Sequence, residues 1–225
     1  MGSEPNFRFS WLSRHMTLRK LGLLGGVLAP LLWLSLIGVA GALRPEFSHV
    51  THYISELGER DSTTEFLVRY GAFVFTGFLY LCFAAALMAT FRGSWAFTFA
   101  AWLIGLDGMG RMGAGVFPCD PGCSGLSASQ ELHHLFATIG FLSGVLAALT
   151  WGVALRLRGA SRAMSGYSFA TGLLALLFLL LMQWRGNPVQ AAGLFEHLAS
   201  GLLSVWVLVL AVRTMRGSNP ALRHD

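Results

Sequence analysis

Apolar residues along this chain gather in six long runs separated by shorter polar intervals. The runs cover residues 20–43, 66–91, 95–118, 132–155, 164–184 and 189–215. Each is close to the roughly 20 residues that an α-helix needs to cross the hydrocarbon core of a bilayer. No run alternates apolar and polar residues as a membrane β-strand does. Each is therefore predicted to be a helix, which satisfies its own backbone hydrogen bonds in lipid.

The runs predict an all-α fold, a polytopic membrane protein built as a six-transmembrane-helix bundle. Three of the intervals are only a few residues long, which makes the flanking helices antiparallel neighbours. The interval at 44–65 is the longest, and we expect a short interfacial helix in this first outer loop. The chain is then divided into a cytoplasmic N-terminal segment (1–19), the six-helix transmembrane domain (20–215) and a cytoplasmic C-terminal tail (216–225). With 54% hydrophobic and 12% charged residues, no soluble domain remains.

Basic residues are distributed unequally between the two sets of loops. Four fall on one side (Arg44, Arg60, Arg69, Arg185), and eleven fall on the other (Arg8, Arg14, Arg19, Lys20, Arg92, Arg156, Arg158, Arg162, Arg213, Arg216, Arg223). The basic side is expected to be cytoplasmic, which puts both termini there, in a bacterial inner membrane. The pI of about 9.6 then indicates contact with anionic lipid rather than with nucleic acid. The first run exceeds the 7–15 apolar residues of a signal peptide, so it is expected to be retained.

The polar residues with useful chemistry gather on the other, outer side. Those in outer loops or at outer helix ends are His49, His52, Ser55, Glu56, Glu59, Asp61, Asp120, Glu131, His133, His134, Glu196 and His197. The cytoplasmic loops are short and carry little besides arginine. Any functional site is therefore expected at the outer face.

The loop between the third and fourth runs reads GVFPCDPGCSG. Pro118 and Pro121 end the third helix and favour a turn. In an oxidising compartment, Cys119 and Cys123 can form a disulfide across this turn. The loop is then a rigid corner, although so small a ring constrains little chain entropy.

A competing interpretation makes this loop part of a metal site. Asp120, His133 and His134, together with Cys119 or with His52 of the first loop, are residue types that bind zinc. The spacing, Cys-x3-Cys followed nine residues later by His-His, matches no standard zinc motif. His133 and His134 are also about 100° apart on a helix, so they cannot point to the same place.

The first loop contains HVTHYISELGERDSTTEF, residues 49–66. A short helix here would place His49, His52 and Glu56 on one side, where they could hold a metal or position a base. The alternative is an amphipathic lid helix in the membrane interface, with its apolar side formed by Tyr53, Ile54 and Leu57.

Ionisable residues also occur inside the third and sixth runs. Asp107 and Arg111 are four residues apart near the middle of the third run and are expected to pair, either as a functional group or as a neutral structural ion pair. Glycines at 105–115 favour close packing of this helix. Glu196 and His197 lie just inside the outer end of the sixth run, where the carboxylate needs a partner.

Several segments resemble the six-span membrane proteins of the domain of unknown function 998 family. The most specific are Ile-Ser-Glu-Leu-Gly at 54–58, Phe-Pro-Cys-Asp at 117–120 and the histidine opening the fourth run. The resemblance covers about 22–212 and implies that the family's motif positions are Ser55, Glu56, Phe117, Pro118, Cys119, Asp120, His133 or His134, and Glu196. His197 stands where an arginine is expected. The resemblance supports fold and topology and implies no activity.

Two classes of function fit these observations. The first is a metal-assisted hydrolase acting on a lipid or lipid-linked substrate, with zinc as its cofactor and Ser55, Glu56, Asp120, His134 and Glu196 as catalytic residues. The second is a non-catalytic lipid-binding protein or a subunit of a membrane complex. Its partners are membrane lipids and either a second copy of the chain or another protein. A haem or quinone redox protein is a further alternative, although no C-x-x-C-H motif is present.

Overall fold

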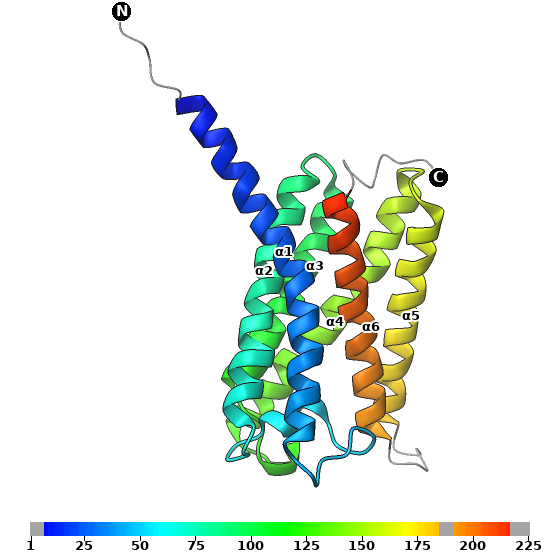
Figure 1. The fold of residues 1–225 in the computed structure, drawn as a ribbon. Coiled ribbons are helices and arrows are strands. Elements are labelled where there is room, and N and C mark those ends of the chain that lie inside the picture. Colours follow the sequence, from blue (N-terminus) through cyan, green and yellow to red (C-terminus); the bar gives the residue numbers. More distant parts are fainter. Residues whose placement is uncertain (1–6, 185–190, 217–225) are drawn as a thin grey trace, which may run out of the picture.

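The computed structural model describes residues 7–184 and 191–216. Within them lie six long helices: α1 (Phe7–Ala42), α2 (Thr76–Thr90), α3 (Trp95–Val116), α4 (Ala128–Leu157), α5 (Arg162–Gln183) and α6 (Ala192–Arg216). A π-helix, η2 (Leu67–Phe75), runs directly into α2, and 3-10 turns form at η1 (Ile54–Gly58) and η3 (Pro121–Cys123). The described residues contain no strand, and the helices form an antiparallel bundle (Figure 1).

Five segments are long and apolar enough to cross a membrane: Leu18–Ala42, Leu67–Thr90, Ala128–Leu157, Arg162–Gln183 and Ala192–Arg216. The chain is thus an integral membrane protein by the length and composition of its helices. The expected count of six is not reached, because α3 falls outside this set. Its glycines and its Asp107 and Arg111 lower the mean hydropathy of a helix that is otherwise long enough.

Helix α3 is nevertheless the most enclosed helix of the bundle. It packs between α2 and α4, and 14 of its 22 residues are buried. Glycines allow this close approach on both sides: Gly77 of α2 meets Gly108, and Gly110 meets Gly140 of α4. Small residues of this kind are typical of helix contacts in membranes.

Hydroxyl groups link the outer helices α5 and α6 to the rest of the bundle. Trp206 of α6 donates from Nε1 to Ser168 Oγ of α5 at 3.0 Å. Ser165 of α5 donates to the Gly152 carbonyl of α4 at 2.9 Å. Such interhelical hydrogen bonds stabilise association where lipid offers no competing partner.

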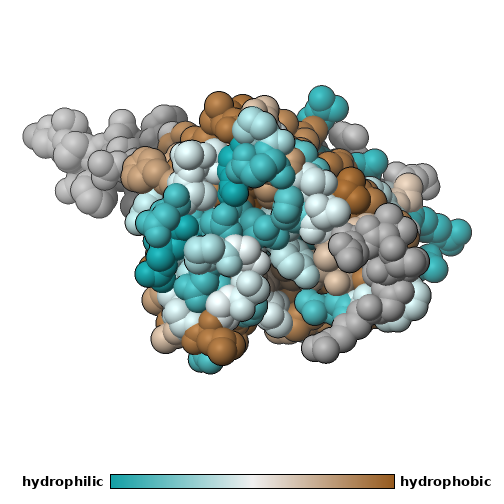
Figure 2. All heavy atoms as spheres, turned by 90° about the horizontal axis from the view of Figure 1, so that it is seen from below, coloured by the Kyte–Doolittle hydropathy of each residue, from teal (hydrophilic) through white to brown (hydrophobic). Residues whose placement is uncertain are grey.

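The end of the bundle that carries residues 43–66 and 117–127 is called the polar end here. Both described chain ends, at Phe7 and Arg216, lie at the opposite end (Figure 1). Seen from below, the polar end shows a broad hydrophilic surface with apolar side chains at its rim (Figure 2). The polar loops predicted to share one face are thus together in the fold.

The conformation of the first loop differs from the predicted interfacial helix. Only Ile54–Gly58 is helical, as a 3-10 turn, and residues 49–53 are not. His49, His52 and Glu56 therefore do not form one helical side. Ile54 and Leu57 are buried in the protein core rather than exposed on an interfacial surface. The segment is too short to stand alone and is shaped by its contacts with the bundle.

Candidate functional site

A cavity of about 540 Å³ lies inside the half of the bundle next to the polar end. Its polar lining includes Tyr53, Ser55, Asp107, Arg111, His133, His134, Thr138, Gln183, Glu196 and Ser200. Its apolar lining includes Trp33, Phe73, Ala137, Phe141, Leu142, Leu176, Leu179, Leu180 and Met182. A mostly apolar cavity with a few polar groups is the usual form of a small-molecule site.

The deepest charged group of the cavity is the ion pair within α3. Arg111 Nε donates to Asp107 Oδ1 at 2.9 Å, and the two residues are 8% and 4% exposed. The guanidinium carbon lies 4.5 Å from the ring centre of Trp33 and 4.7 Å from that of Tyr80. Arg111 is therefore in contact with two aromatic rings, which stabilise its charge away from water.

One end of this guanidinium remains without a protein partner. Among the described residues, the buried Arg111 Nη1 has no hydrogen-bond acceptor. Leaving a buried donor unpaired is costly, and more so when it carries charge. Arg111 lines the cavity, so a bound molecule there would lie beside a charged group whose hydrogen-bonding capacity is only partly used.

Glu196 of α6 is the second acidic group in the cavity wall. Its Oε2 accepts a hydrogen bond from the Ile54 backbone N–H at 2.7 Å, so it caps the 3-10 turn of the first loop. One turn further along α6, Ser200 Oγ accepts from Trp33 Nε1 at 2.9 Å. Trp33 therefore lies between Arg111 of α3, which its ring contacts, and Ser200, which is one helical turn from Glu196 on α6.

The first loop is fastened to the start of α6 by further contacts. The Leu194 N–H donates to the Val50 carbonyl at 2.9 Å. His197 Nδ1 lies 2.8 Å from the Gly193 carbonyl and therefore carries a proton. Its Nε2 can then accept from His49 Nδ1, 2.9 Å away. The first loop is thus held against α6, and its residues Tyr53 and Ser55 line the cavity.

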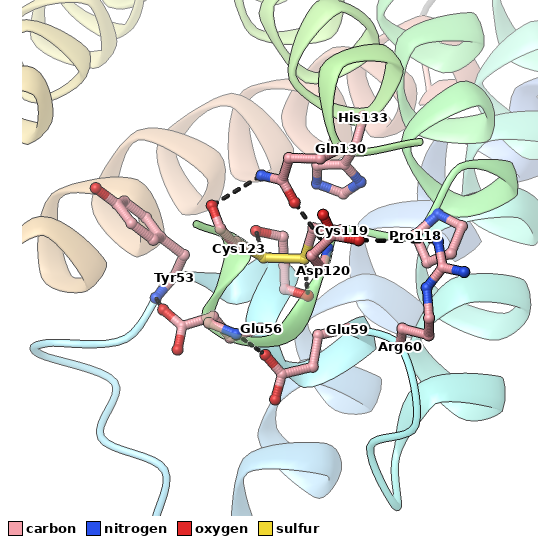
Figure 3. Close-up of a disulfide and its surroundings, with 12 residues drawn as sticks. Tyr53, Glu56, Glu59, Arg60, Pro118, Cys119, Asp120, Cys123, Gln130 and His133 are labelled. Atoms are coloured by element: carbon pink, nitrogen blue, oxygen red, sulfur yellow. Dashed lines mark hydrogen bonds and ion pairs between the residues drawn. A yellow bond between two sulfur atoms is a disulfide. The ribbon is translucent and has the colours of Figure 1, made fainter. Parts of the chain in front are cut away.

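The α3–α4 loop forms the corner that was expected from its prolines and cysteines. Cys119 and Cys123 are joined by a disulfide. Asp120 accepts from the Ser127 hydroxyl at 2.8 Å and from the Ser127 N–H at 3.1 Å. Ser127 is the N-cap of α4, because its Oγ accepts from the Gln130 N–H at 3.1 Å. Asp120 thus anchors the start of α4 and does not line the cavity (Figure 3).

Gln130 joins this corner to the cavity. Its Oε1 accepts from the Asp120 N–H at 2.7 Å. Its Nε2 lies 2.8 Å from the Cys123 carbonyl and 2.8 Å from His134 Nε2, so both amide hydrogens are used. His134 must then accept on Nε2. A fully satisfied buried amide of this kind makes the corner rigid.

His133 supports the end of α3. Its Nδ1 lies 2.9 Å from the Ala114 carbonyl and 2.9 Å from the Phe117 carbonyl. The ring therefore carries a proton on Nδ1 and donates to the last carbonyls of the helix, which otherwise lack partners. Arg69 donates to two more, Gly115 at 2.9 Å and Val116 at 3.0 Å. These two side chains cap α3 from the neighbouring helices.

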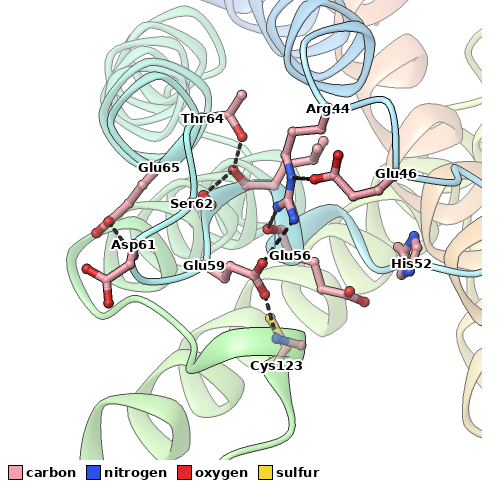
Figure 4. A network of polar contacts seen from close by, with 12 residues as sticks. Arg44, Glu46, His52, Glu56, Glu59, Asp61, Ser62, Thr64, Glu65 and Cys123 are labelled. Carbon is pink, nitrogen blue, oxygen red and sulfur yellow. Dashed lines mark hydrogen bonds and ion pairs between the residues drawn. The ribbon is translucent and has the colours of Figure 1, made fainter.

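Glu56 and Glu59 belong to a polar network around Arg44 (Figure 4). Arg44 donates to Glu46 at 2.8 Å, to Glu59 at 3.2 Å and to the Glu56 carbonyl at 2.7 Å. Glu56 uses its own carboxylate to accept from the Tyr53 N–H at 2.8 Å. Burial opposes the charge of Arg44, but hydrogen bonds and charge from the carboxylates of Glu46 and Glu59 outweigh it and raise the pKa of the guanidinium. The network holds the first loop in place.

The geometry of the described residues gives no support to the zinc interpretation. Among the described residues, no three His, Cys, Asp or Glu side chains are arranged to hold a metal ion. His52 Nδ1 accepts from the Ser48 N–H at 2.9 Å, and Asp120, His133 and His134 serve the corner and the helix caps. Metal ligands on separate loops converge only if the tertiary structure brings them together, and here these side chains are hydrogen-bonded to backbone groups and to Ser127 and Gln130.

The chain was compared with known proteins and families. The model of a protein family of unknown function, DUF998, matches residues 27–213. The chain belongs to the DUF998 family. No curated protein and no solved structure matches it. Membership covers every described helix except parts of α1 and α6 and supplies no activity.

Of the catalytic residues expected in this DUF998 chain, three line the cavity: Ser55, His134 and Glu196. Ser55 Oγ lies 3.3 Å from the disulfide sulfur of Cys123, and Glu56 and Asp120 are used in loop structure. Sequence reasoning missed Trp33, Tyr80, Gln130 and Ser200. An aromatic or small polar residue in an apolar run looks like ordinary core, so the sequence offered no signal for them.

The carboxylate of Asp120 provides a pH-dependent prediction. The Ser127 hydroxyl and then its N–H, with the charge of Arg60, lower the pKa of Asp120. A lowered folded-state pKa stabilises the protein above the ordinary value and loses that contribution as pH falls through about 4 and below. Asp120→Asn should lower the unfolding temperature by a few degrees at pH 7 and by less at pH 3. Thermal unfolding at both pH values tests this, with Asp61→Asn as the exposed control. An equal deficit at both would contradict it.

Proposed function

We propose that this protein binds one lipid molecule, taken from the membrane through a side opening of the cavity between α4 and α5. The observation that carries the proposal is that residues of one cavity wall also face outward. Leu142 of α4 and Leu180 of α5 line the cavity and are 47% and 62% exposed. On membrane-crossing helices, such exposed leucines contact lipid tails.

The course of α4 supports such an opening. Near residues 157–162, α4 and α5 are in contact: Gly152 lies against Phe169, and Gly172 lies against Leu149. Toward the polar end the cavity separates their outer halves, at 137–142 of α4 and 176–183 of α5. In Figure 1, α4 runs obliquely behind α6 while α5 descends at the edge of the bundle. A lipid tail would leave the cavity here, with its head group among the polar residues.

The proposal includes a topology with six membrane-crossing helices. α3 is covered by α2 and α4, so its ion pair faces protein and cavity rather than lipid, which is where membrane proteins place such groups. With α3 counted, both termini lie on the arginine-rich side. We take this side as the cytoplasm of a bacterial inner membrane. The polar end then faces outward, and the lipid comes from the outer leaflet.

Binding is favoured over hydrolysis as the function of the cavity. Two of the residues expected to be catalytic, Glu56 and Asp120, are hydrogen-bonded within the loops. The side chains that remain in the cavity are those that orient a head group: Arg111, Tyr53, Glu196 and His134. Nothing in the arrangement pairs Ser55 with a base among the described residues. Release of fatty acid or head group by the purified protein would restore the hydrolase hypothesis.

Filling the cavity should abolish lipid retention. Ala137 lines the cavity, and Ala137→Trp would place an indole where a lipid tail lies. The matched control is Leu146→Trp on the same helix, at a position that is 50% exposed and outside the cavity. After purification in detergent, native mass spectrometry should find about one lipid on the wild type and the control, and none on Ala137→Trp. Equal lipid on all three, or none on the wild type, would refute the proposal.

A further inference from the structure

We infer that the bound lipid carries a zwitterionic head group, with its phosphate on Arg111 and its ammonium group on Glu196. This inference rests on the proposed lipid binding and adds the chemical class of the ligand. It is carried by the positions of the charged groups in the cavity wall. A phospholipid with a phosphoethanolamine head is the simplest molecule that fits them.

Arg111 is oriented to receive an anion. Its Nε donates to Asp107, and the guanidinium also contacts the rings of Trp33 and Tyr80. The guanidinium therefore has a fixed position, and Nη1 has no acceptor among the described residues. A planar guanidinium suits phosphate oxygens better than an ammonium does. A phosphate beside this guanidinium would add a negative partner to a buried cation whose donors are only partly used among the described residues.

The charge balance of the cavity argues against a purely anionic ligand. Asp107 already offsets Arg111, and Glu196 adds a further carboxylate to the same wall. A head group with a phosphate alone would raise the negative charge of a poorly solvated space, which is unfavourable at low dielectric. A zwitterion adds no net charge, provided its cation lies beside Glu196.

The spacing of the two groups fits a short head group. Trp33 contacts Arg111 through its ring and donates to Ser200 through Nε1. Ser200 and Glu196 are four residues apart on α6, about one helical turn of 5.4 Å. The phosphate and ammonium groups of phosphoethanolamine are separated by two carbon atoms, so one head group contacts both sites when it lies along Trp33 between Arg111 and Glu196.

Tyr53 completes the cation side. It lines the cavity, and burial, followed by the charges of Glu196 and Glu56, raises the pKa of its hydroxyl. The phenol therefore remains neutral at physiological pH and can donate a hydrogen bond. Its ring is also a surface on which an ammonium group binds favourably. The two sides of the cavity thus present complementary chemistry to the two ends of a zwitterion.

The inference is tested by measuring the affinity of the wild-type protein for three acyl-labelled fluorescent lipids in detergent micelles. Phosphatidylethanolamine carries both charges, phosphatidylglycerol only the phosphate, and diacylglycerol neither. We expect phosphatidylethanolamine to bind at least about tenfold more tightly than either of the others, as one charged hydrogen bond allows. Equal binding of all three would refute the head-group inference and leave lipid binding intact. Tighter binding of phosphatidylglycerol would refute the ammonium site.

Two variants assign each charge to its site. Asp107→Asn/Arg111→Gln removes the ion pair as a whole, so that no charge is left unpaired, and should abolish the advantage of phosphatidylethanolamine over diacylglycerol. Glu196→Gln keeps the acceptor for the Ile54 N–H and should remove only the preference for phosphatidylethanolamine over phosphatidylglycerol. Unchanged preferences in both folded variants would overturn the assignment.

A competition experiment separates a lipid from a soluble ligand of the same chemistry. Free phosphoethanolamine should not displace labelled phosphatidylethanolamine at concentrations up to about a thousandfold above the lipid, because it lacks the tails that the apolar wall holds. Efficient displacement would show that the head group alone is the ligand. The proposed lipid binding would then fail, while the zwitterion assignment would stand. No binding of any probe would refute both.

Discussion

Gly110→Val is expected to destabilise the protein by more than about 3 kcal/mol, at the upper end of the range for overpacking. A Cβ atom at residue 110 would lie 2.5 Å from Gly140 Cα, 2.5 Å from Gly140 N and 2.7 Å from the Phe136 carbonyl. All three are backbone atoms of α4, so no side chain can rotate away. The two helices would have to separate, and the cavity wall that they share would open.

The control is Gly166→Val on α5, where an added Cβ meets no atom within 4 Å. This substitution should change stability by less than about 1 kcal/mol, because it alters only helix propensity at a membrane-facing position. Unfolding in mixed detergent micelles, followed by circular dichroism, measures both variants. Similar stabilities for the two would show that the α3–α4 contact is not as close as described.

Asp107→Asn is expected to destabilise the protein by about 3–5 kcal/mol, because it leaves the buried charge of Arg111 without its counter-ion. The pair is 2.9 Å apart between Nε and Oδ1, and both side chains are more than nine-tenths buried inside the bundle. Cation–π contacts with Trp33 and Tyr80 reduce this cost but do not supply a negative charge.

The double variant Asp107→Asn/Arg111→Gln should recover most of the lost stability. Replacing both members of a buried pair by neutral residues of similar shape is often close to neutral. A double-mutant cycle on the same unfolding measurement gives the coupling energy between the residues. Additive losses, with no recovery in the double variant, would mean that the two charges do not stabilise one another.

The wild-type protein in this cycle should be measured with and without phosphatidylethanolamine. A ligand that binds only the folded state adds to its stability, so the lipid should stabilise wild type and not the double variant. This comparison separates the structural role of the ion pair from its role in binding. Equal stabilisation of both by the lipid would place the phosphate elsewhere in the cavity.

Much of this protein is determined by local sequence. The apolar runs predict helices, because in lipid the backbone has no other way to satisfy its hydrogen bonds. Their bounds agree with α2–α6 within a few residues, apart from the start of α4 at Ala128 and the π-helical first part of the second run. The i, i+4 spacing of Asp107 and Arg111 and the short Cys119–Cys123 interval likewise indicate contacts that helix and turn geometry produce almost unaided.

Other expectations depended on contacts between distant segments and were wrong or incomplete. The first loop was expected to form a helix, but Glu196 and Arg44, far apart in the sequence, hold it as one 3-10 turn. The zinc interpretation would bring His133 together with other ligands, but no such group is found among the described residues, and His133 caps α3. The partners of the first loop and of His133 could not be named from sequence. A polar side chain can reach several donors and acceptors, and only the packing of distant segments decides which of them lies within hydrogen-bond distance.

The sequence by itself therefore determined that this is an all-helical membrane protein whose polar loops share one end. Only the tertiary structure decided that Trp33, Arg111 and Glu196 meet around one cavity, with Tyr80 packed against Arg111, and that residues of both α4 and α5 line it. The physical reason is the range of the interactions. Hydrophobic periodicity and helix geometry act over a few residues, whereas a cavity is the space left when whole helices pack, and its lining depends on every crossing angle at once.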